Sequence, residues 1–147
     1  MKPTKFNIRV YGLLVHAGRL LVSEEVIGGD RYMKFPGGGL VPGEGTHQGL
    51  QREIREELGM EVRDLRHFYT TDFFQPSAFH PQDQIISIYY RFMVDDPGSI
   101  VDGAPAPGPE VEFEQKLHWI PLERAVETDV DLPIDRVVMR LILEQLT

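Results

Sequence analysis

The sequence predicts an α/β fold, and three observations support it. Residues 6–16 alternate in polarity with the period of a strand, and residues 46–58 follow the period of an amphipathic helix. A second amphipathic helix is expected at the end of the chain. The remaining predicted elements are strands at roughly 61–74, 84–94 and 116–120, a long exposed loop over 95–110, a helical turn over 121–127 and the last helix over 133–146.

The first predicted strand has two unlike faces. One face carries Phe6, Ile8, Val10, Gly12 and Leu14, and the other carries Asn7, Arg9 and Tyr11. The turn signal at 17–19 predicts a hairpin with a second strand over 20–23. After a loop at 28–30, a short extended stretch should reach Phe35, because the following proline disfavours helix there.

Composition narrows the class of protein. The chain has 147 residues, 41% hydrophobic and 26% charged, which indicates one globular domain over 1–147. It has no cysteine, which excludes disulfides and thiolate metal sites and is compatible with the reducing cytoplasm, where we expect the protein. A net charge of −8 argues against a broad nucleic-acid-binding face, and no apolar run suits a signal peptide or a membrane span.

A glycine-rich loop leads directly into the first predicted helix. Pro36 to Gly39 and Pro42 to Gly45 form the loop, Thr46 is expected to cap the helix, and Gly59 should end it. On this helix three glutamates span an arc of roughly 100° beside an apolar stripe that would dock on a sheet. The glutamates are Glu53, Glu56 and Glu57, and the stripe is Leu50, Ile54 and Leu58.

The three glutamates suggest a bound cation. Like charges spaced three and four residues apart repel, and the helix dipole adds to that cost near the C-terminal end. Oxygen donors without cysteine suit Mg²⁺ or Mn²⁺, which commonly bridge carboxylates and substrate phosphates. Taken alone, the same three residues also fit an ordinary solvated helix face.

The combined spacing decides between these readings. Gly38 is followed after five residues by Glu44 and after seven more by the run Arg52-Glu53-Ile54-Arg55-Glu56-Glu57-Leu58-Gly59-Met60. This pattern resembles the Nudix box at every specified position. The resemblance implies an α/β/α sandwich with a mixed β-sheet and Mg²⁺-dependent hydrolysis of a nucleoside diphosphate linked to another group. It also makes a homodimer plausible, because many relatives form one.

The resemblance assigns roles to box residues. It implies metal binding by Gly38, Glu53, Glu56 and Glu57, with Glu56 or Glu57 the first candidate for the base that orients the attacking water. Arg52 would hold these glutamates in place, and Glu44 would stabilise the loop and helix. Many relatives use one more acid from a later loop. The candidates here are Glu110, Glu112 and Glu114, of which Glu112 and Glu114 are favoured.

Substrate contacts are expected from the sheet and the loop. Arg9 and Tyr11 share the polar face of the first strand, where arginine suits phosphate and tyrosine can stack on a base. Arg91 occupies a comparable face of a later strand. Lys34 precedes the glycine-rich loop and could meet a phosphate, and Gly38 and Gly39 would allow close backbone approach.

Three functions remain open at this point. The first is hydrolysis of a nucleotide sugar or ADP-ribose type of substrate, and the second is hydrolysis of nucleoside triphosphates to monophosphate and diphosphate. The third is a non-catalytic module that senses a nucleotide. The intact set of box glutamates favours an enzyme with a small-molecule nucleotide substrate.

Overall fold

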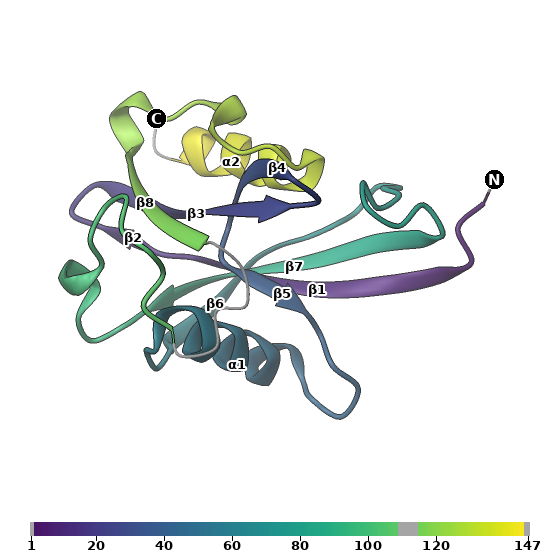
Figure 1. Ribbon diagram of the computed structural model, residues 1–147, viewed down its shortest axis with the longest axis horizontal. Coiled ribbons are helices and arrows are strands. Elements are labelled where there is room, and N and C mark those ends of the chain that lie inside the picture. Colours follow the sequence, from purple (N-terminus) through teal and green to yellow (C-terminus); the bar gives the residue numbers. More distant parts are fainter. Residues whose placement is uncertain (1, 109–114, 146–147) are drawn as a thin grey trace.

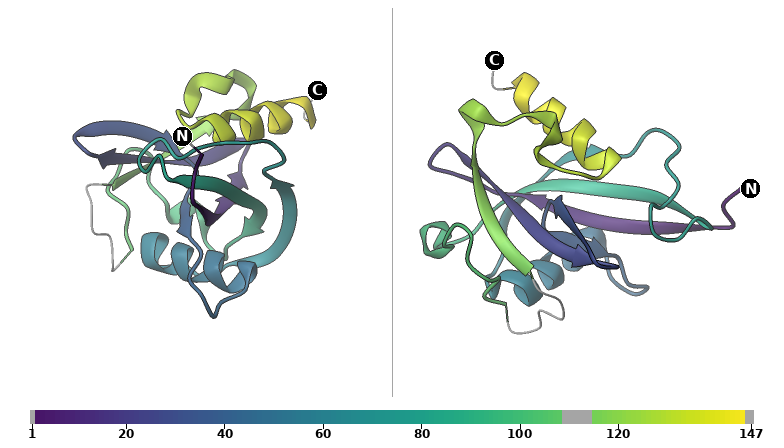
Figure 2. Two further views of the ribbon diagram at one scale, coloured as in Figure 1. Left: turned by 90° about the vertical axis from the view of Figure 1, so that its right-hand side faces the viewer. Right: turned by 45° about the horizontal axis from the view of Figure 1, so that its top comes forward.

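The computed structural model describes residues 2–108 and 115–145, which are arranged in three layers (Figure 1). Helix α1 (Thr46–Leu58) covers one side of the strands and helix α2 (Pro133–Gln145) covers the other. The view turned by a right angle shows the strands between the two helices (Figure 2). The predicted α/β/α sandwich is therefore confirmed.

The first sheet is mixed, as expected. Its order is β5-β1-β7-β6, with β1 at Lys5–Leu13, β5 at Gly37–Gly39, β6 at Arg63–Thr70 and β7 at Asp83–Met93. Strand β1 runs parallel to β7, while β5 pairs antiparallel with β1 and β6 pairs antiparallel with β7. The pairing of β5 with β1 brings the glycine-rich loop to the centre of the molecule.

A second sheet contains antiparallel pairs only. It joins β2 (Val15–His16), β3 (Arg19–Ile27), β4 (Asp30–Lys34) and β8 (Gln115–Pro121), with β3 between β8 and β4. The predicted strand over 6–16 is interrupted at Leu14, where the chain leaves the first sheet and enters the second. The expected hairpin is therefore confined to β2 and β3, and the predicted strand at 20–23 continues to Ile27.

Two apolar clusters fill the spaces between the layers. The cluster beneath α1 contains the predicted stripe Leu50, Ile54 and Leu58, packed on residues such as Val10 and Trp119. The cluster beneath α2 includes Tyr11, Leu20, Phe35, Tyr89 and Val138. Adjacent residues Val10 and Tyr11 thus face opposite helices, as the alternation of a strand requires.

Helix α1 begins differently from the prediction. Gly45, not Thr46, is the N-cap residue, and its N–H donates to the side chain of Gln48. Thr46 is the first helical residue, and its hydroxyl lies 2.6 Å from that of Tyr90. The predicted end is confirmed, because Gly59 adopts the left-handed conformation with φ of 67°.

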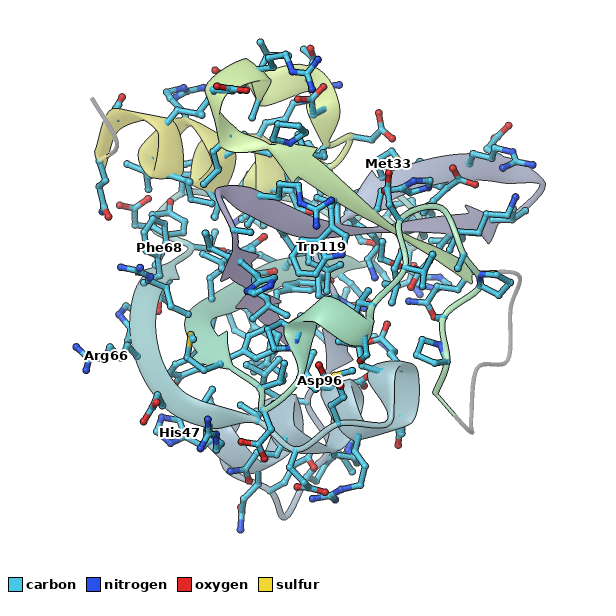
Figure 3. The ribbon with its side chains drawn as sticks, turned by 90° about the vertical axis from the view of Figure 1, so that its left-hand side faces the viewer. Met33, His47, Arg66, Phe68, Asp96 and Trp119 are labelled. Carbon is cyan, nitrogen blue, oxygen red and sulfur yellow. The ribbon has the colours of Figure 1, made fainter. Side chains whose placement is uncertain are left out.

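The long loop after β7 is anchored in the core. A 3₁₀ turn covers Pro97–Ser99, and the carbonyl of Ile100 accepts the indole N–H of Trp119 at 2.8 Å. Trp119 lies at the centre of the view in Figure 3. The predicted helical turn over 121–127 corresponds to two 3₁₀ turns, Leu122–Arg124 and Glu127–Asp129. In the described ranges, no helix is both long and apolar enough to cross a membrane.

Candidate active site

Glu57 is the most enclosed of the three box glutamates. Its side chain turns inward from α1, and the residue is only 8% exposed. The N–H of Gly37 donates to Oε2 at 3.0 Å, and the amide of Gln115 donates to Oε1 at 2.9 Å. Burial raises the pKa of Glu57 to about 8, although Lys34 and Gln115 act to lower it.

Arg52 holds the other two carboxylates. Its Nη1 lies 3.0 Å from Glu53 Oε1 and 3.3 Å from Glu56 Oε2. Its remaining N–H groups donate to both oxygens of Glu44, at 3.0 and 2.8 Å, and to the carbonyl of Gly39 at 3.0 Å. Arg52 and Glu44 therefore have the geometry of supporting residues, and the carbonyl of Gly39 is occupied by Arg52.

Two glycines allow the loop to lie against the helix. Gly37 has φ of 145°, and a Cβ there would stand 2.1 Å from the carbonyl oxygen of Val10. A Cβ on Gly38 would stand 2.6 Å from Oε1 of Glu53. Any larger residue would push the strand or the carboxylate away, which explains the glycines in physical terms.

The second sheet supplies a polar group of residues, of which the sequence reasoning predicted Lys34 and missed Ser23, Glu25 and Gln115. Ser23 pairs with Lys34 across β3 and β4, and Glu25 pairs with Gln115 across β3 and β8. Directly opposed residues point to the same side of a sheet, and so do Ser23 and Glu25, which lie two apart on β3. All four side chains therefore share one face. The two-residue spacing of Leu21, Ser23 and Glu25 could have placed these residues on one face of a strand. The predicted strand ended at residue 23 and so did not include Glu25.

Three predicted substrate contacts line one cavity of about 450 Å³. These are Arg9, Tyr11 and Lys34. The ammonium of Lys34 is buried and pairs with Glu25 at 3.1 Å. Burial alone would lower the pKa of Lys34, but Tyr11, Glu25 and Glu57 raise it above its ordinary value, so the side chain is a cation. The cavity is of the size that holds small-molecule ligands.

Tyr11 lines the cavity and also contacts both of its cations. It is buried, its hydroxyl accepts a hydrogen bond from Arg9, and the charged ends of Arg9 and Lys34 lie 5.7 and 5.4 Å from its ring centre. Its geometry suits holding two cations at the cavity wall. The more open aromatic side chain in the lining is Phe79, whose ring packs edge-on against Tyr32 at 5.2 Å.

The far wall of the cavity contains a second buried acid. Asp135, in the first turn of α2, accepts hydrogen bonds from the hydroxyl of Tyr89 and from the N–H of Phe35. Burial raises its pKa to about 6. Asn7 and Ser87 add further polar groups to the lining. The cavity lining thus combines two cations, Arg9 and Lys34, with hydrogen-bonding groups around Asp135 on α2.

Arg91 is not brought to this cavity. It is exposed and lines a separate, smaller hollow with residues such as Leu13 and Arg66. It lies on the same face of β7 as Tyr89 but two residues further along, beyond the end of the cavity lining. Its cross-strand partner Arg66 points outward into solvent (Figure 3). The structure therefore does not bring Arg91 together with Arg9 and Lys34, as the prediction of a shared substrate site required.

The candidate loop acids Glu110, Glu112 and Glu114 lie outside the described residues. The residues that flank them both bind Glu57. The N–H of Gly108 donates to the carbonyl of Glu57 at 2.8 Å, and the side chain of Gln115 binds its carboxylate. The described residues on either side of segment 109–114 therefore both contact α1.

The donor set of the site suits a hard cation. All candidate donors are oxygens. Burial is the main cause that raises the pKa of both Glu53 and Glu57, and a neighbouring acid raises each of them further. Within 2–108 and 115–145, no three acidic or histidine side chains converge tightly enough to enclose an ion by themselves. Mg²⁺ commonly takes only one or two carboxylates, with water and substrate phosphate completing its shell, so these residues fit it.

Comparisons with known proteins agree with this geometry. The model of the NUDIX domain matches residues 5–141. The MutT structure from work on Aliivibrio salmonicida and Vibrio cholerae is 18% identical with a TM-score of 0.67, covering 97% of this chain and 99% of that one. The Escherichia coli ORF135 protein is 19% identical with a TM-score of 0.71, covering 96% and 91%. MutT NUDIX hydrolase from Burkholderia pseudomallei is 19% identical with a TM-score of 0.68, covering 98% and 99%.

A curated relative matches a shorter segment. It is an RNA pyrophosphohydrolase from Cronobacter sakazakii, 42% identical over 43 residues, which are 29% of this chain and 24% of the relative. The structural likenesses establish the fold. Because the domain model covers nearly the whole sequence and the box residues are assembled as described, the chain belongs to the Nudix family.

Proposed function

We propose that residues 1–147 form one hydrolase domain that cleaves the diphosphate linkage of a nucleoside diphosphate derivative with the aid of Mg²⁺. One observation carries the proposal. The cavity of about 450 Å³ is lined by the cations Arg9 and Lys34 and by the buried Asp135 of α2. Arg9 interacts electrostatically with Glu53, and Lys34 with Glu57, which links the cavity lining to the carboxylates of α1. A ligand with a negative centre and a larger organic group fits such a lining.

The residues have separable roles in this proposal. Arg9 and Lys34 bind the diphosphate, because both are cations in the cavity lining and are held over Tyr11. The nucleoside occupies the part lined by Ile85, Ile134 and Asp135. Bound between the carboxylates and the diphosphate, Mg²⁺ would neutralise charge and polarise the phosphoryl group.

The carboxylates divide the remaining work. Glu57 and Glu53, which are the more buried, would hold the cation together with the carbonyl of Gly38. Glu56 is the most accessible of the three, with 32% of its side chain exposed, and it takes only the longest contacts to Arg52. We propose Glu56 as the group that accepts a proton from the attacking water, with Arg52 keeping it in position.

Two other functions would use the same site. A triphosphate substrate would be cut to monophosphate and diphosphate, and a sensing module would bind a nucleotide without turnover. The match to an RNA pyrophosphohydrolase adds the 5′-phosphorylated end of RNA to the substrates worth testing.

A product assay separates these functions. The purified chain is incubated with Mg²⁺, Mn²⁺ or EDTA and a panel of nucleotide sugars, ADP-ribose, nucleoside triphosphates and 5′-triphosphorylated RNA. We expect a nucleoside monophosphate plus a phosphorylated second group, formed only with metal. Monophosphate plus diphosphate would favour the triphosphate reading, and binding without turnover across the panel would favour the sensing module.

Two variants complete that assay. Glu57→Gln should reduce turnover by roughly 10²–10³-fold, because it weakens the hold on the cation that would stabilise charge in the transition state. Glu61→Gln is the matched control, because Glu61 is exposed beyond the end of α1 and pairs only with Arg55 within the described residues. Equal turnover by the wild type and Glu57→Gln would contradict the assigned mechanism.

A further inference from the structure

Gln115 is a buried polar residue next to the site without an assigned role. It is the first residue of β8 and is 6% exposed. Its amide nitrogen donates two hydrogen bonds, to Glu57 Oε1 at 2.9 Å and to the hydroxyl of Ser23 at 2.7 Å. Ser23 is fully buried on the neighbouring strand β3. The amide is therefore fixed on one side and bound to the carboxylate on the other.

The register of the second sheet explains why this side chain reaches Glu57. Gln115 lies opposite Glu25, and Leu117 lies opposite Ser23. Along β8 the same face carries Trp119 and Leu117, which pack beneath α1, and then Gln115. The face thus changes from apolar to polar where it meets the last turn of the box helix.

The hydrogen-bond donors to Glu57 differ in charge from the donor to the neighbouring acids. Glu53 and Glu56 bind a guanidinium, which supplies positive charge as well as hydrogen bonds. Among the described residues, the hydrogen-bond donors to Glu57 are neutral and come from Gln115 and the backbone of Gly37. A neutral donor orients a carboxylate and leaves its charge free for a cation, and each oxygen keeps a lone pair.

We propose that Gln115, steadied by Ser23, is a positioning residue that holds the Glu57 carboxylate in the orientation that binds a divalent cation. The inference rests on the proposed metal site. It adds two residues of the second sheet to the site, since Ser23 on β3 and Gln115 on β8 act on the cation through Glu57. A competing explanation is that Gln115 only fastens β8 to α1.

Mn²⁺ binding to the substrate-free protein, measured by electron paramagnetic resonance, tests the proposal. Gln115→Met keeps the length of the side chain and removes both donors. We expect the Kd for Mn²⁺ to rise about tenfold or more, as loss of a residue that orients a metal ligand commonly does. The melting temperature of the metal-free protein should change little. Gln84→Met is the matched control, because no side-chain hydrogen bond of Gln84 is found in the described part of the chain.

A second variant covers the case in which Gln115→Met does not fold. Ser23→Ala removes the outer support alone and should raise the Kd by about threefold, in line with one hydrogen bond between neutral groups. An unchanged Kd in a folded Gln115→Met, or in Ser23→Ala where the first variant is unfolded, would overturn the proposal. A lower melting temperature with an unchanged Kd would identify Gln115 as a structural fastener.

The same titration distinguishes this inference from the proposed function. If the wild type binds no Mn²⁺, or Glu57→Gln binds it as well as the wild type, the metal site itself is wrong. If the wild type binds Mn²⁺, Glu57→Gln does not, and Gln115→Met matches the wild type, only the positioning role is wrong.

Discussion

Two buried acids, one on each helix, have unlike surroundings. Glu57 on α1 and Asp135 on α2 are both buried, and burial raises the pKa of each, to about 8 and about 6 respectively. Around Glu57, two further acids, Glu25 and Glu53, push its pKa up. Around Asp135, the leading neighbours are Tyr89, Lys34 and the N–H of Phe35, which all act to lower its pKa.

The difference separates the site where we propose that a cation binds from one that the protein completes itself. The hydroxyl of Tyr89 and the N–H of Phe35 satisfy Asp135, so its charge is compatible with burial near neutral pH. Glu57 shares its surroundings with other acids, and its hydrogen bonds come from neutral groups. Lys34 acts to lower the pKa of both acids.

The largest expected effect comes from removing that shared cation. Lys34→Met leaves Glu25 and Glu57 buried without their nearest positive charge. We expect the free energy of unfolding of the metal-free protein to fall by about 3–5 kcal/mol, the usual cost of breaking a buried ion pair from one side. Urea unfolding measures this change.

A matched lysine gives the control. Lys116 lies on β8 and has no ion pair among the described residues, so Lys116→Met should change the unfolding free energy by less than about 1 kcal/mol. Equal effects of the two variants would show that Lys34 does not serve the two acids.

The pH dependence of stability should reveal the acid on α2. The pKa of Asp135 is raised from 3.8 to about 6, so below about pH 4 both the folded and the unfolded chain hold the proton. Between about pH 4 and 6 the unfolded chain releases it first, and the unfolding free energy falls as pH rises, by about 3 kcal/mol. Asp135→Asn should lack this fall. A difference between the two proteins that stays constant from pH 4 to 7 would contradict it.

A smaller effect is expected from a change in the cavity lining. Arg9→Met removes a cation from the cavity lining, and we expect KM for a diphosphate substrate to rise by about tenfold or more, with a smaller change in kcat. Steady-state kinetics measure both constants. Arg91→Met is the control, because Arg91 lies outside this cavity. A rise in KM for Arg91→Met equal to that for Arg9→Met would place the substrate elsewhere.

The smallest effect is expected at the exposed C-terminal end of α1. Arg55 pairs with Glu61 at 2.8 Å, but more than half of each side chain is exposed. Arg55→Ala should therefore change the unfolding free energy by less than about 1 kcal/mol. A loss comparable to that of Lys34→Met would mean that exposure does not distinguish these charge pairs.

The sequence could predict the box because its chemistry is local. One helix carries Glu53, Glu56, Glu57 and their apolar stripe, and the periodicity of α1 places them together without reference to other strands. Gln115, Ser23 and Asp135 reach the site only through the pairing of β3 with β8 and the packing of α2. Arg91 shows the converse, since it shares a face with Tyr89 but lies beyond the end of the cavity.

Titration with Mn²⁺ in the absence of substrate compares the two acids most directly. We expect the wild type and Asp135→Asn to bind Mn²⁺ with the same Kd, because hydrogen bonds within the protein already satisfy the carboxylate of Asp135. We expect Glu57→Gln to lose most of this binding. Binding that survives Glu57→Gln and is lost in Asp135→Asn would contradict the proposed cation site at Glu57.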